Sequence, residues 1–509
     1  MIDPTARRRP RRPLFHRLGA GIALASLLAG CSVTPKPLTA SELSHTADQN
    51  RVQVTANQEP VTGPIDLYEA MARALKYNLD YRVGLMQQAV KSRELNLATY
   101  DMLPQIVANA SYYGRSNEAG ASSLSLLSGT QSLEPSTSSQ KNTFSGDLTA
   151  SWDILDFGLS YVRAQQKADA VMVAAEERRK VSNRIIEDVR TSYYRAVSAQ
   201  RLLDQLTALQ QSIATTLDNS EKLAQRRTAP PLVALTYQRE LVEIQTQIQS
   251  LSRELMISKQ QLAALMNLDP GAPYQLVMPP RETELPAVAL TVDDEIGTAL
   301  RDRPELRQYS YQGRSNRREM TAQVLAAFPS FKGFVGYDGD TNSFLFNQSW
   351  AEWGAKSAFN LISLVRLPAE RKAVRAQGDA IHTQELATVM AVMTQVYVAR
   401  TRYKLYGDEL ETQRHAHAIQ ERIMGQVGGG YKAGTVSEQT WLREQMNSLV
   451  SEVRYDIAYA DAQNAYANLY SAMGVDSFTP EVTSQQSVGQ LQGALRDMWA
   501  KRQLASAAE

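Results

Sequence analysis

The chain has 509 residues, and its 54 Lys and Arg against 53 Asp and Glu leave a formal net charge of +1. This balance excludes the strongly basic surface of nucleic-acid-binding proteins, so we expect no nucleic-acid partner. The single cysteine excludes an internal disulfide. A mean hydropathy of −0.34 and an aromatic content of 7% favour long helices with narrow apolar seams over a compact α/β globule.

The N-terminal thirty residues have the pattern of a secretory signal peptide. An arginine-rich start precedes the apolar run LGAGIALASLLAG at residues 18–30, which is too short for a comfortable membrane span. Leu28-Ala29-Gly30-Cys31 resembles the bacterial lipobox, so we expect cleavage after residue 30 and fatty acylation (palmitate) of Cys31. Ser32 favours the outer membrane by that resemblance. The alternative is an ordinary signal peptide before an accidental cysteine. Residues 31–64, rich in Ser, Thr, Pro and Gln, predict an extended acylated leader.

The rest of the chain repeats itself. DLYEAMARALKYNLDYR at residues 66–82 echoes VDDEIGTALRDRPELRQ at residues 292–308, and Ala74-Leu75 matches Ala299-Leu300 with an offset of 225. LVALTYQRE at residues 232–240 matches VSEQTWLRE at residues 436–444 with an offset of 204. Two tandem repeats follow from these matches, and a tail closes the chain. We place the first repeat at 65–280, the second at 281–478 and the tail at 479–509.

Each repeat predicts a helix, a β-hairpin and a long helical hairpin. Pro104 and Pro329 stop the leading helices, because proline removes a backbone donor and restricts the residue before it. The hairpins are expected at about 104–157 and 329–367, and the helical hairpins at about 158–269 and 368–473. Apolar residues at three-and-four spacing predict a coiled-coil seam in each return helix. In the second repeat Asn464 interrupts that seam.

The predicted strands alternate in character. In FSGDLTASWDI, residues 144–154, one face is apolar and the other is polar, which fits a water-lined membrane barrel or a half-exposed soluble sheet. The second repeat offers FKGFVGYD at residues 331–338 and, less clearly, KSAFNLISLV at residues 356–365, with Trp350 and Trp353 in the loop between them. Four strands cannot close a membrane barrel, so copies must pool their strands. Three copies would supply twelve.

The order of these motifs resembles the TolC-like outer-membrane efflux protein family over about residues 60–478. SWDILDFG at residues 151–158 is similar to the family's W-D-x-x-D-x-G strand-to-helix exit, and GYKAGTVS at residues 430–437 to its Y-x-x-G-x-x-S hairpin tip. The exit residues are Trp152, Asp153, Asp156 and Gly158. The resemblance implies a mainly α fold with a membrane β-barrel: a homotrimer with a twelve-stranded barrel in outer-membrane lipid and a twelve-helix periplasmic α-barrel. It also implies a passive conduit that works with a periplasmic adaptor and an inner-membrane transporter of the RND or ABC type.

The resemblance further implies closure at the periplasmic helix tips. Glycines 428–430 are expected to mark the tip turn of the second hairpin, and Pro230-Pro231 the break in the first. The residues expected at the aperture are Tyr237, Arg239, Tyr431, Gly434, Glu438, Thr440, Trp441 and Arg443. An aromatic constriction at Tyr237, Tyr431 and Trp441 is one interpretation. Packing of Tyr237 and Trp441 within the hairpin seam is the other.

Enzymatic chemistry finds little support, and we expect no catalytic residue, metal or cofactor. The glycine-rich stretch lacks the Lys-Ser/Thr ending of a phosphate-binding loop. A non-transporting coiled-coil lipoprotein, structural or adhesive, is the main rival to the conduit. It does not explain the duplicated hairpins. The exit duct of a type I protein secretion system is a further alternative. The expected lipidation favours drug or small-molecule efflux slightly over protein secretion.

Overall fold

The computed structural model describes residues 35–132, 134–225, 231–269, 271–281, 285–288, 290–475 and 486–507. The chain divides into two units, Met1–Gln58 and Glu59–Glu509. The expected cleavage site and Cys31 lie outside the described residues. The described part of the first unit contains the helix α2 (Ala40–Val54), so the prediction of an extended chain is wrong for residues 40–54. A capping box explains this helix: Thr39 and Glu42 each bond the other's backbone N–H.

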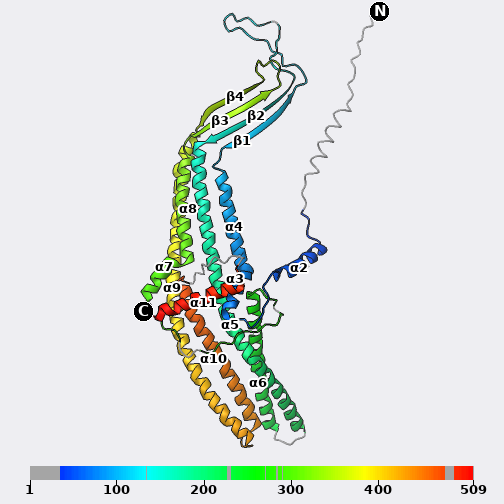
Figure 1. The fold of residues 1–509 in the computed structure, drawn as a ribbon, viewed down its shortest axis with the longest axis vertical. Helices are drawn as coiled ribbons and strands as arrows, with labels where there is room; N and C mark the ends of the chain where they lie inside the picture. Colours follow the sequence, from blue (N-terminus) through cyan, green and yellow to red (C-terminus); the bar gives the residue numbers. More distant parts are fainter. Residues whose placement is uncertain are drawn as a thin grey trace, which may run out of the picture. The chain divides into compact units, whose positions relative to one another are not determined.

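The second unit confirms the duplication (Figure 1). Its first repeat comprises α3 (Leu67–Tyr77), α4 (Leu79–Tyr100), β1 (Gln105–Gly114), β2 (Asn142–Asp153), α5 (Ile154–Gln225) and α6 (Pro231–Leu265). Its second comprises α7 (Val292–Asp302), α8 (Pro304–Ala326), β3 (Ser330–Asp340), β4 (Ser349–Ala358), α9 (Leu361–Lys432) and α10 (Glu438–Ala472). Helices α5 and α9 both have 72 residues, and α6 and α10 both have 35. A last helix, α11 (Val488–Ala507), follows.

The fourth strand differs from its prediction. β4 spans Ser349–Ala358, so Trp350 and Trp353 lie within the strand rather than in a loop. The helix α9 begins at Leu361, where Asn360 caps it by accepting from the N–H of Ile362. Pro368 therefore lies inside α9, and the helical hairpin begins seven residues before the predicted 368. The aromatic residues pack well on a pleated surface, whereas the run after Ala358 is apolar without alternation.

The offset between the repeats also needs correction. The elements up to β1 and β3 are 225 residues apart, and those from β2 and β4 onward are about 207 apart, since α5 and α9 start at Ile154 and Leu361. The length difference therefore lies in the β1–β2 connection. The predicted offset of 204 at the tips is three residues short. Three residues is close to one helical turn, so an amphipathic pattern matches almost equally well in either alignment.

The four strands form one antiparallel sheet in the order β1-β2-β3-β4. Each strand is joined to one helix: β1 to α4, β2 to α5, β3 to α8 and β4 to α9. These helices pack side by side in the same order as the strands, with α5 against α4 and α8, and α8 against α9. Further along, α5 packs against α6 and α10, and α10 packs against α9. The long helices α5 and α9 therefore belong to two groups of four helices. Near the sheet they pack with α4 and α8, and further along they pack with α6 and α10. No helix in the described part of the chain carries an apolar stretch long enough to cross a membrane.

The C-terminal helix α11 packs against α3. Its buried residues Val488, Leu491 and Leu495 join a core cluster with Leu75, and Arg496 pairs with Asp66. The guanidinium of Arg190 in α5 lies 4.7 Å from the centre of the Trp499 ring, a cation–π contact. This helix therefore ties the C-terminal part of the chain to the start of the first repeat.

Candidate functional site

One face of the sheet is apolar across all four strands. Paired residues on adjacent strands share a face, so each row of partners can be followed across the sheet. One row is Ile106, Ala150, Val335 and Trp353, and the next is Ala108, Leu148, Tyr337 and Ala351. The large members are exposed, with Ile106 at 73% and Trp353 at 80%. A continuous exposed apolar face of this kind marks a surface that meets lipid or a partner.

The opposite face of the sheet is polar and carries its own cross-strand bonds. The amide of Asn109 donates to Asp147 at 3.0 Å, and the hydroxyls of Ser111 and Ser145 lie 2.7 Å apart. Thr149 donates to Asp147 at 3.1 Å. The polarity of the two faces, as predicted for β2, therefore extends to β1. A sheet with one apolar and one polar face separates two environments.

Both edges of the folded unit are open. Among the described strands, β1 and β4 each pair on one side only. The helix α4 on the β1 side exposes a seam with three-and-four spacing, typical of a coiled coil. Its members are Leu79, Val83, Met86, Val90, Leu97 and Tyr100. The helix α6 on the same side exposes Leu235, Val242 and Met256 at multiples of seven. On the β4 side, α9 exposes Leu386, Met390 and Tyr397.

The tip of the second helical hairpin is compact and hydrogen-bonded. The glycines 428–430 belong to the last turn of α9, so they do not form the turn itself, contrary to the prediction. Gly434 forms it, with φ +72°, which favours glycine. Ser437 then caps α10 by accepting from the N–H of Thr440 at 3.2 Å. The rings of Tyr431 and Trp441 stack across the turn at 4.7 Å between centroids.

The two hairpin tips of one chain are joined by charged and polar contacts. Glu240 of α6 accepts from Gln439 at 2.5 Å and pairs with Arg443 at 3.4 Å, both on α10. The hydroxyl of Thr216 on α5 donates to Glu438 at 3.5 Å. Burial, with the nearby carboxylates of Glu438 and Glu240, raises the pKa of Tyr237. The first and second hairpins therefore meet near their tips.

The aromatic residues at the tips take part in packing. Tyr237 and Trp441 pack against the core cluster that contains Leu209, Leu241 and Leu442. By the corrected offset, Tyr237 corresponds to Glu444 and not to Trp441. Partial burial acts to raise the pKa of Glu444, but hydrogen bonds from Gln420 and Asn447 and the Arg443 charge bring it below its ordinary value. Arg239 faces solvent, with Glu243 at 3.8 Å.

No protein-family model matches the chain, and no curated protein matches it in sequence. Solved structures do match. The CmeC outer membrane channel of Campylobacter jejuni is 12% identical over 87% of this chain and 94% of its own, with a TM-score of 0.62. The open-state MtrE outer membrane channel of Neisseria gonorrhoeae is 17% identical over 80% and 88%, with a TM-score of 0.60. CusC is 17% identical over 83% and 96%, with a TM-score of 0.59. The chain has the fold of the TolC-like outer-membrane channels.

In this TolC-like fold, the residues at the strand–helix junctions have structural roles. Pro104 and Pro329 directly precede β1 and β3. Asp153 accepts from the N–H groups of Leu155 and Asp156 and so caps the start of α5. The Trp152 indole donates to the Met102 carbonyl at 3.3 Å, and its ring contacts Phe157. Asp156 is exposed in the first turn of α5, and Gly158 follows it within the helix.

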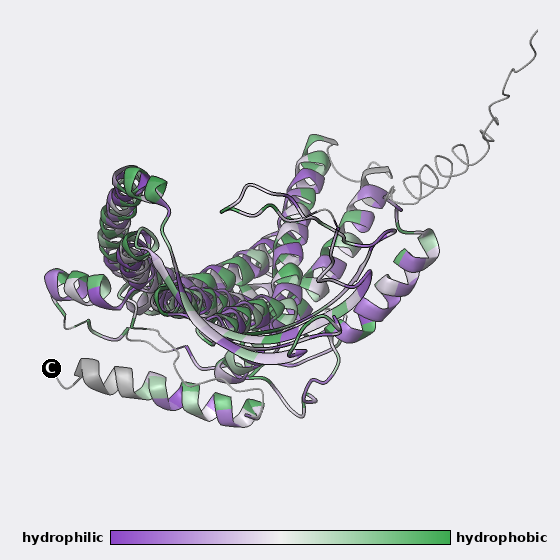
Figure 2. Ribbon diagram, turned by 90° about the horizontal axis from the view of Figure 1, so that it is seen from above, coloured by the Kyte–Doolittle hydropathy of each residue, from purple (hydrophilic) through white to green (hydrophobic). Residues whose placement is uncertain are grey.

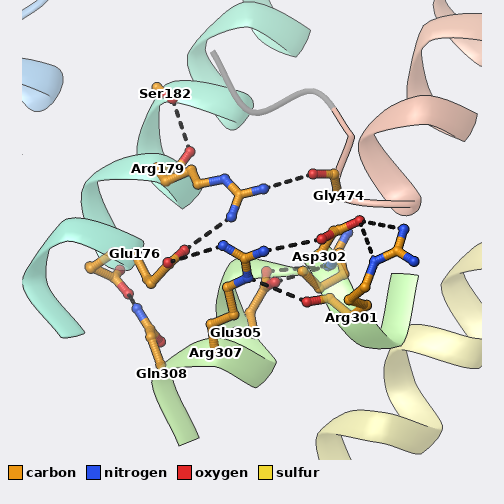
Figure 3. A network of polar contacts seen from close by, with 11 residues as sticks. Glu176, Arg179, Ser182, Arg301, Asp302, Glu305, Arg307, Gln308 and Gly474 are labelled. Carbon is orange, nitrogen blue, oxygen red and sulfur yellow. Dashed lines mark hydrogen bonds and ion pairs between the residues drawn. The ribbon is translucent and has the colours of Figure 1, made fainter. Parts of the chain in front are cut away.

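Sequence reasoning missed a polar network that joins the two repeats of the TolC-like fold (Figure 3). Arg179 of α5 bonds Glu176 at 3.2 Å and the Gly474 carbonyl at 2.8 Å. Arg307 of α8 bonds Asp302 at 3.1 Å and approaches Glu176 at 3.9 Å. Only the charged character of these helical faces was visible in the sequence, because the contacts that join the repeats, Arg179 to Gly474 and Arg307 to Glu176, link residues more than 100 positions apart.

Sequence reasoning also missed Glu240 and the exposed seam on α4. The seam was detectable, because its three-and-four spacing is legible between residues 79 and 100. Glu240 lies inside the repeated motif, yet its contact with Arg443 joins two separate hairpins. Among the described residues, no three His, Cys, Asp or Glu side chains gather in a way that could hold a metal ion.

Proposed function

We propose that the chain is the outer-membrane channel subunit of a tripartite efflux or secretion system and works as a homotrimer. The observation that carries this proposal is the pair of open edges. One edge presents β1, α4 and α6, the other presents β4 and α9, and both expose apolar residues. Unpaired strand edges and exposed seams are costly unless another chain covers them. A second copy added head to tail would pair its β4 edge with the β1 edge of the first copy. It would also cover the exposed helix seams.

Head-to-tail association of identical chains closes into a ring when the rotation between copies allows it. Three copies would give a ring of twelve strands and, beneath it, twelve helices at each level. The apolar face of the sheet would then meet lipid, and the polar face would line the duct. The fold shared with CmeC, MtrE and CusC, which are described as outer-membrane or transmembrane channels, supports this arrangement.

The remaining parts of the proposal concern placement and partners. The N-terminal segment would direct export, and acylated Cys31 would anchor each copy in outer-membrane lipid. The long helical hairpins would reach into the periplasm, towards an adaptor protein and an inner-membrane transporter of the RND or ABC type. The duct would be a passive conduit with no catalytic step.

We propose closure of the duct at the hairpin tips. The Glu240–Arg443 pair and the Gln439–Glu240 bond hold the two hairpins of one chain together. The carboxylates of Glu240 and Glu438 both lie near Tyr237. If the tips must separate to open, Arg443→Ala should raise the closed-state conductance of the trimer in a planar bilayer. Tyr431→Phe keeps the ring stack with Trp441 and serves as the matched control. Unchanged conductance in Arg443→Ala contradicts this gating role.

The central experiment uses the native chain from outer-membrane extracts. Unheated samples should migrate as a trimer in a denaturing gel and heated samples as a monomer. The same trimer should conduct ions across a planar lipid bilayer. A stable water-soluble monomer, or a membrane-bound protein that never conducts, would overturn the proposal in favour of a non-transporting coiled-coil lipoprotein.

A further inference from the structure

The described parts of the connection between β1 and β2, residues 115–132 and 134–141, form a second, smaller hairpin beyond the sheet. Ala121 and Ser136 exchange two backbone hydrogen bonds, of 2.9 and 3.0 Å. Ser132 donates to the Ser123 carbonyl and Ser125 to the Thr130 carbonyl, each at 2.9 Å. At the base, the N–H of Arg115 donates to the Lys141 carbonyl. These isolated bridges join the two arms of the connection on either side of its tip.

That tip presents two leucines to the outside. The side chains of Leu126 and Leu127 are 98% and 102% exposed, and Leu124 is 61% exposed. Gly129, with φ +66°, closes the turn, and its N–H donates to the Ser125 carbonyl. Residues 119–133 contain no charged residue. An uncharged tip with two adjacent, fully exposed leucines indicates a contact surface, and no other part of the described chain covers it.

The base of this hairpin is fastened to the β3–β4 connection. Asn342 is 7% exposed, its Oδ1 accepts from the N–H of Gln140 at 3.2 Å, and its Nδ2 donates to the Ser138 carbonyl at 3.0 Å. The N–H of Ser343 donates to the Gln140 side chain at 3.3 Å. Phe346 in the same connection is 101% exposed. These bonds fix the direction in which the hairpin leaves the sheet.

That direction is towards the hollow of the sheet. Seen from above, the strands form a curved band, and the long β1–β2 connection reaches over its concave side (Figure 2). The apolar row that contains Ile106 and Trp353 is strongly exposed, whereas Ser151 on the polar face is 7% exposed. Side chains crowd on the concave side of a curved sheet, so the polar face is the concave one. The leucine tip thus projects over the polar, duct-side surface.

We propose that the leucine tips of three copies meet over the outer end of the duct and close it by apolar contact. This inference rests on the proposed trimer, in which each concave face surrounds a common axis. A tip that projects over that face points towards the tips of the other two copies. Each tip therefore packs against the same segment of a second copy, with Leu126 and Leu127 as the contact residues. The outer end would then have a closure separate from that of the periplasmic tips.

The first test is thiol cross-linking in the full-length chain, whose single native cysteine is Cys31. Leu127→Cys should form a disulfide between two of the three copies in isolated outer membranes under mild oxidation, so that a dimer band replaces up to about two-thirds of the monomer band in a non-reducing gel. Trp353→Cys, which is 80% exposed on the apolar face, is the matched control and should stay monomeric. The unaltered chain reports any background from Cys31.

The second test is conduction. Leu126→Ser with Leu127→Ser should raise the conductance of the purified trimer, because the hydroxyls remove the apolar contact without altering the backbone. Both positions are fully exposed in the single chain, so folding should be unaffected. A heat-sensitive trimer with no cross-link at Leu127→Cys overturns the outer closure while leaving the proposed channel intact. Protection of that thiol from a water-soluble maleimide by lipid vesicles, without a cross-link, overturns it in favour of a lipid contact. Absence of any trimer would overturn the channel itself.

Discussion

At the scale of single residues, two glycines with positive φ end long helices in different surroundings. Gly434 has φ +72° and open space around the position of a Cβ, whereas at Gly474, with φ +73°, a Cβ would lie 2.8 Å from the Arg303 nitrogen and the Asp302 carbonyl carbon. Gly434→Ala should destabilise by about 1 kcal/mol through the backbone alone. Gly474→Ala should lose roughly 1–3 kcal/mol more from the clash. Thermal unfolding of the two variants in detergent measures the difference, and equal losses would contradict it.

The glycines before the tip behave in the opposite way. Gly428 lies inside α9 with nothing within 4 Å of an added Cβ, whereas a Cβ on Gly430 would meet the Val436 side chain at 2.5 Å. Alanine is a better helix former than glycine, so Gly428→Ala should stabilise the chain by about 0.5–1 kcal/mol. Gly430→Ala is the matched control and should give no such gain. Destabilisation by Gly428→Ala would show that these glycines serve the turn after all.

Glu295 gives stability an unusual dependence on pH. Burial raises the pKa of this fully buried carboxyl above its ordinary value of 4.5, although Arg400 lies 2.7 Å from it. An acid with a raised folded-state pKa contributes stability that is complete below its ordinary pKa and is lost as pH rises through the folded-state pKa. The free energy of unfolding of Glu295→Gln, relative to that of the native chain, should therefore be higher at pH 7 than at pH 4. Unfolding midpoints at both values test this, and a constant difference would refute it.

At the scale of elements, Asp456 joins both repeats and the connection between α6 and α7. Its carboxylate, 7% exposed on α10, accepts from Arg201 of α5 at 2.7 Å and from Arg281 of the α6–α7 connection at 2.5 Å. Asp456→Ala would leave Arg201 without its carboxylate partner and Arg281 with Glu452 alone, and should destabilise by about 3 kcal/mol. Glu452 contacts only one of them, at 3.1 Å, and is less buried. Glu452→Ala should lose about 1 kcal/mol or less, and equal losses for the two variants would contradict the assigned role.

The elements show which parts of the fold can be predicted from local patterns. The long helices were predictable from seams such as Leu241 to Leu255, and Pro104 and Pro329 gave the starts of β1 and β3. β4 was misplaced because its two tryptophans lie on opposite faces, Trp353 on the apolar face and Trp350 on the polar face, so the strand shows no clear alternation in sequence. α2 was missed because its signal is a capping box without an apolar seam. The tip alignment failed by one helical turn.

At the scale of the whole molecule, the polar and apolar sheet faces were predictable, but the open edges were not. Whether a helix lies at an edge depends on the order α4-α5-α8-α9, which no local pattern encodes. The Glu240–Arg443 contact and the Asn342 fastening also depend on segments that are about 200 residues apart. Tertiary placement therefore decides which exposed apolar residues form an interface and which simply face solvent.

The edge seams make the last prediction. Met86 on α4 and Met390 on α9 are 61% and 64% exposed in the single chain, where an Asp at either position should change stability by about 0.5 kcal/mol or less. If the α4 edge packs against the α9 edge of the next copy, each substitution buries a carboxylate without a partner, which is strongly unfavourable. Met86→Asp or Met390→Asp should therefore abolish the heat-sensitive trimer while the helix content by circular dichroism is retained. Thr321→Asp, exposed on the inner helix α8 between two neighbours of its own chain, should leave the trimer intact. A trimer that survives both methionine substitutions would mean that these edges do not meet.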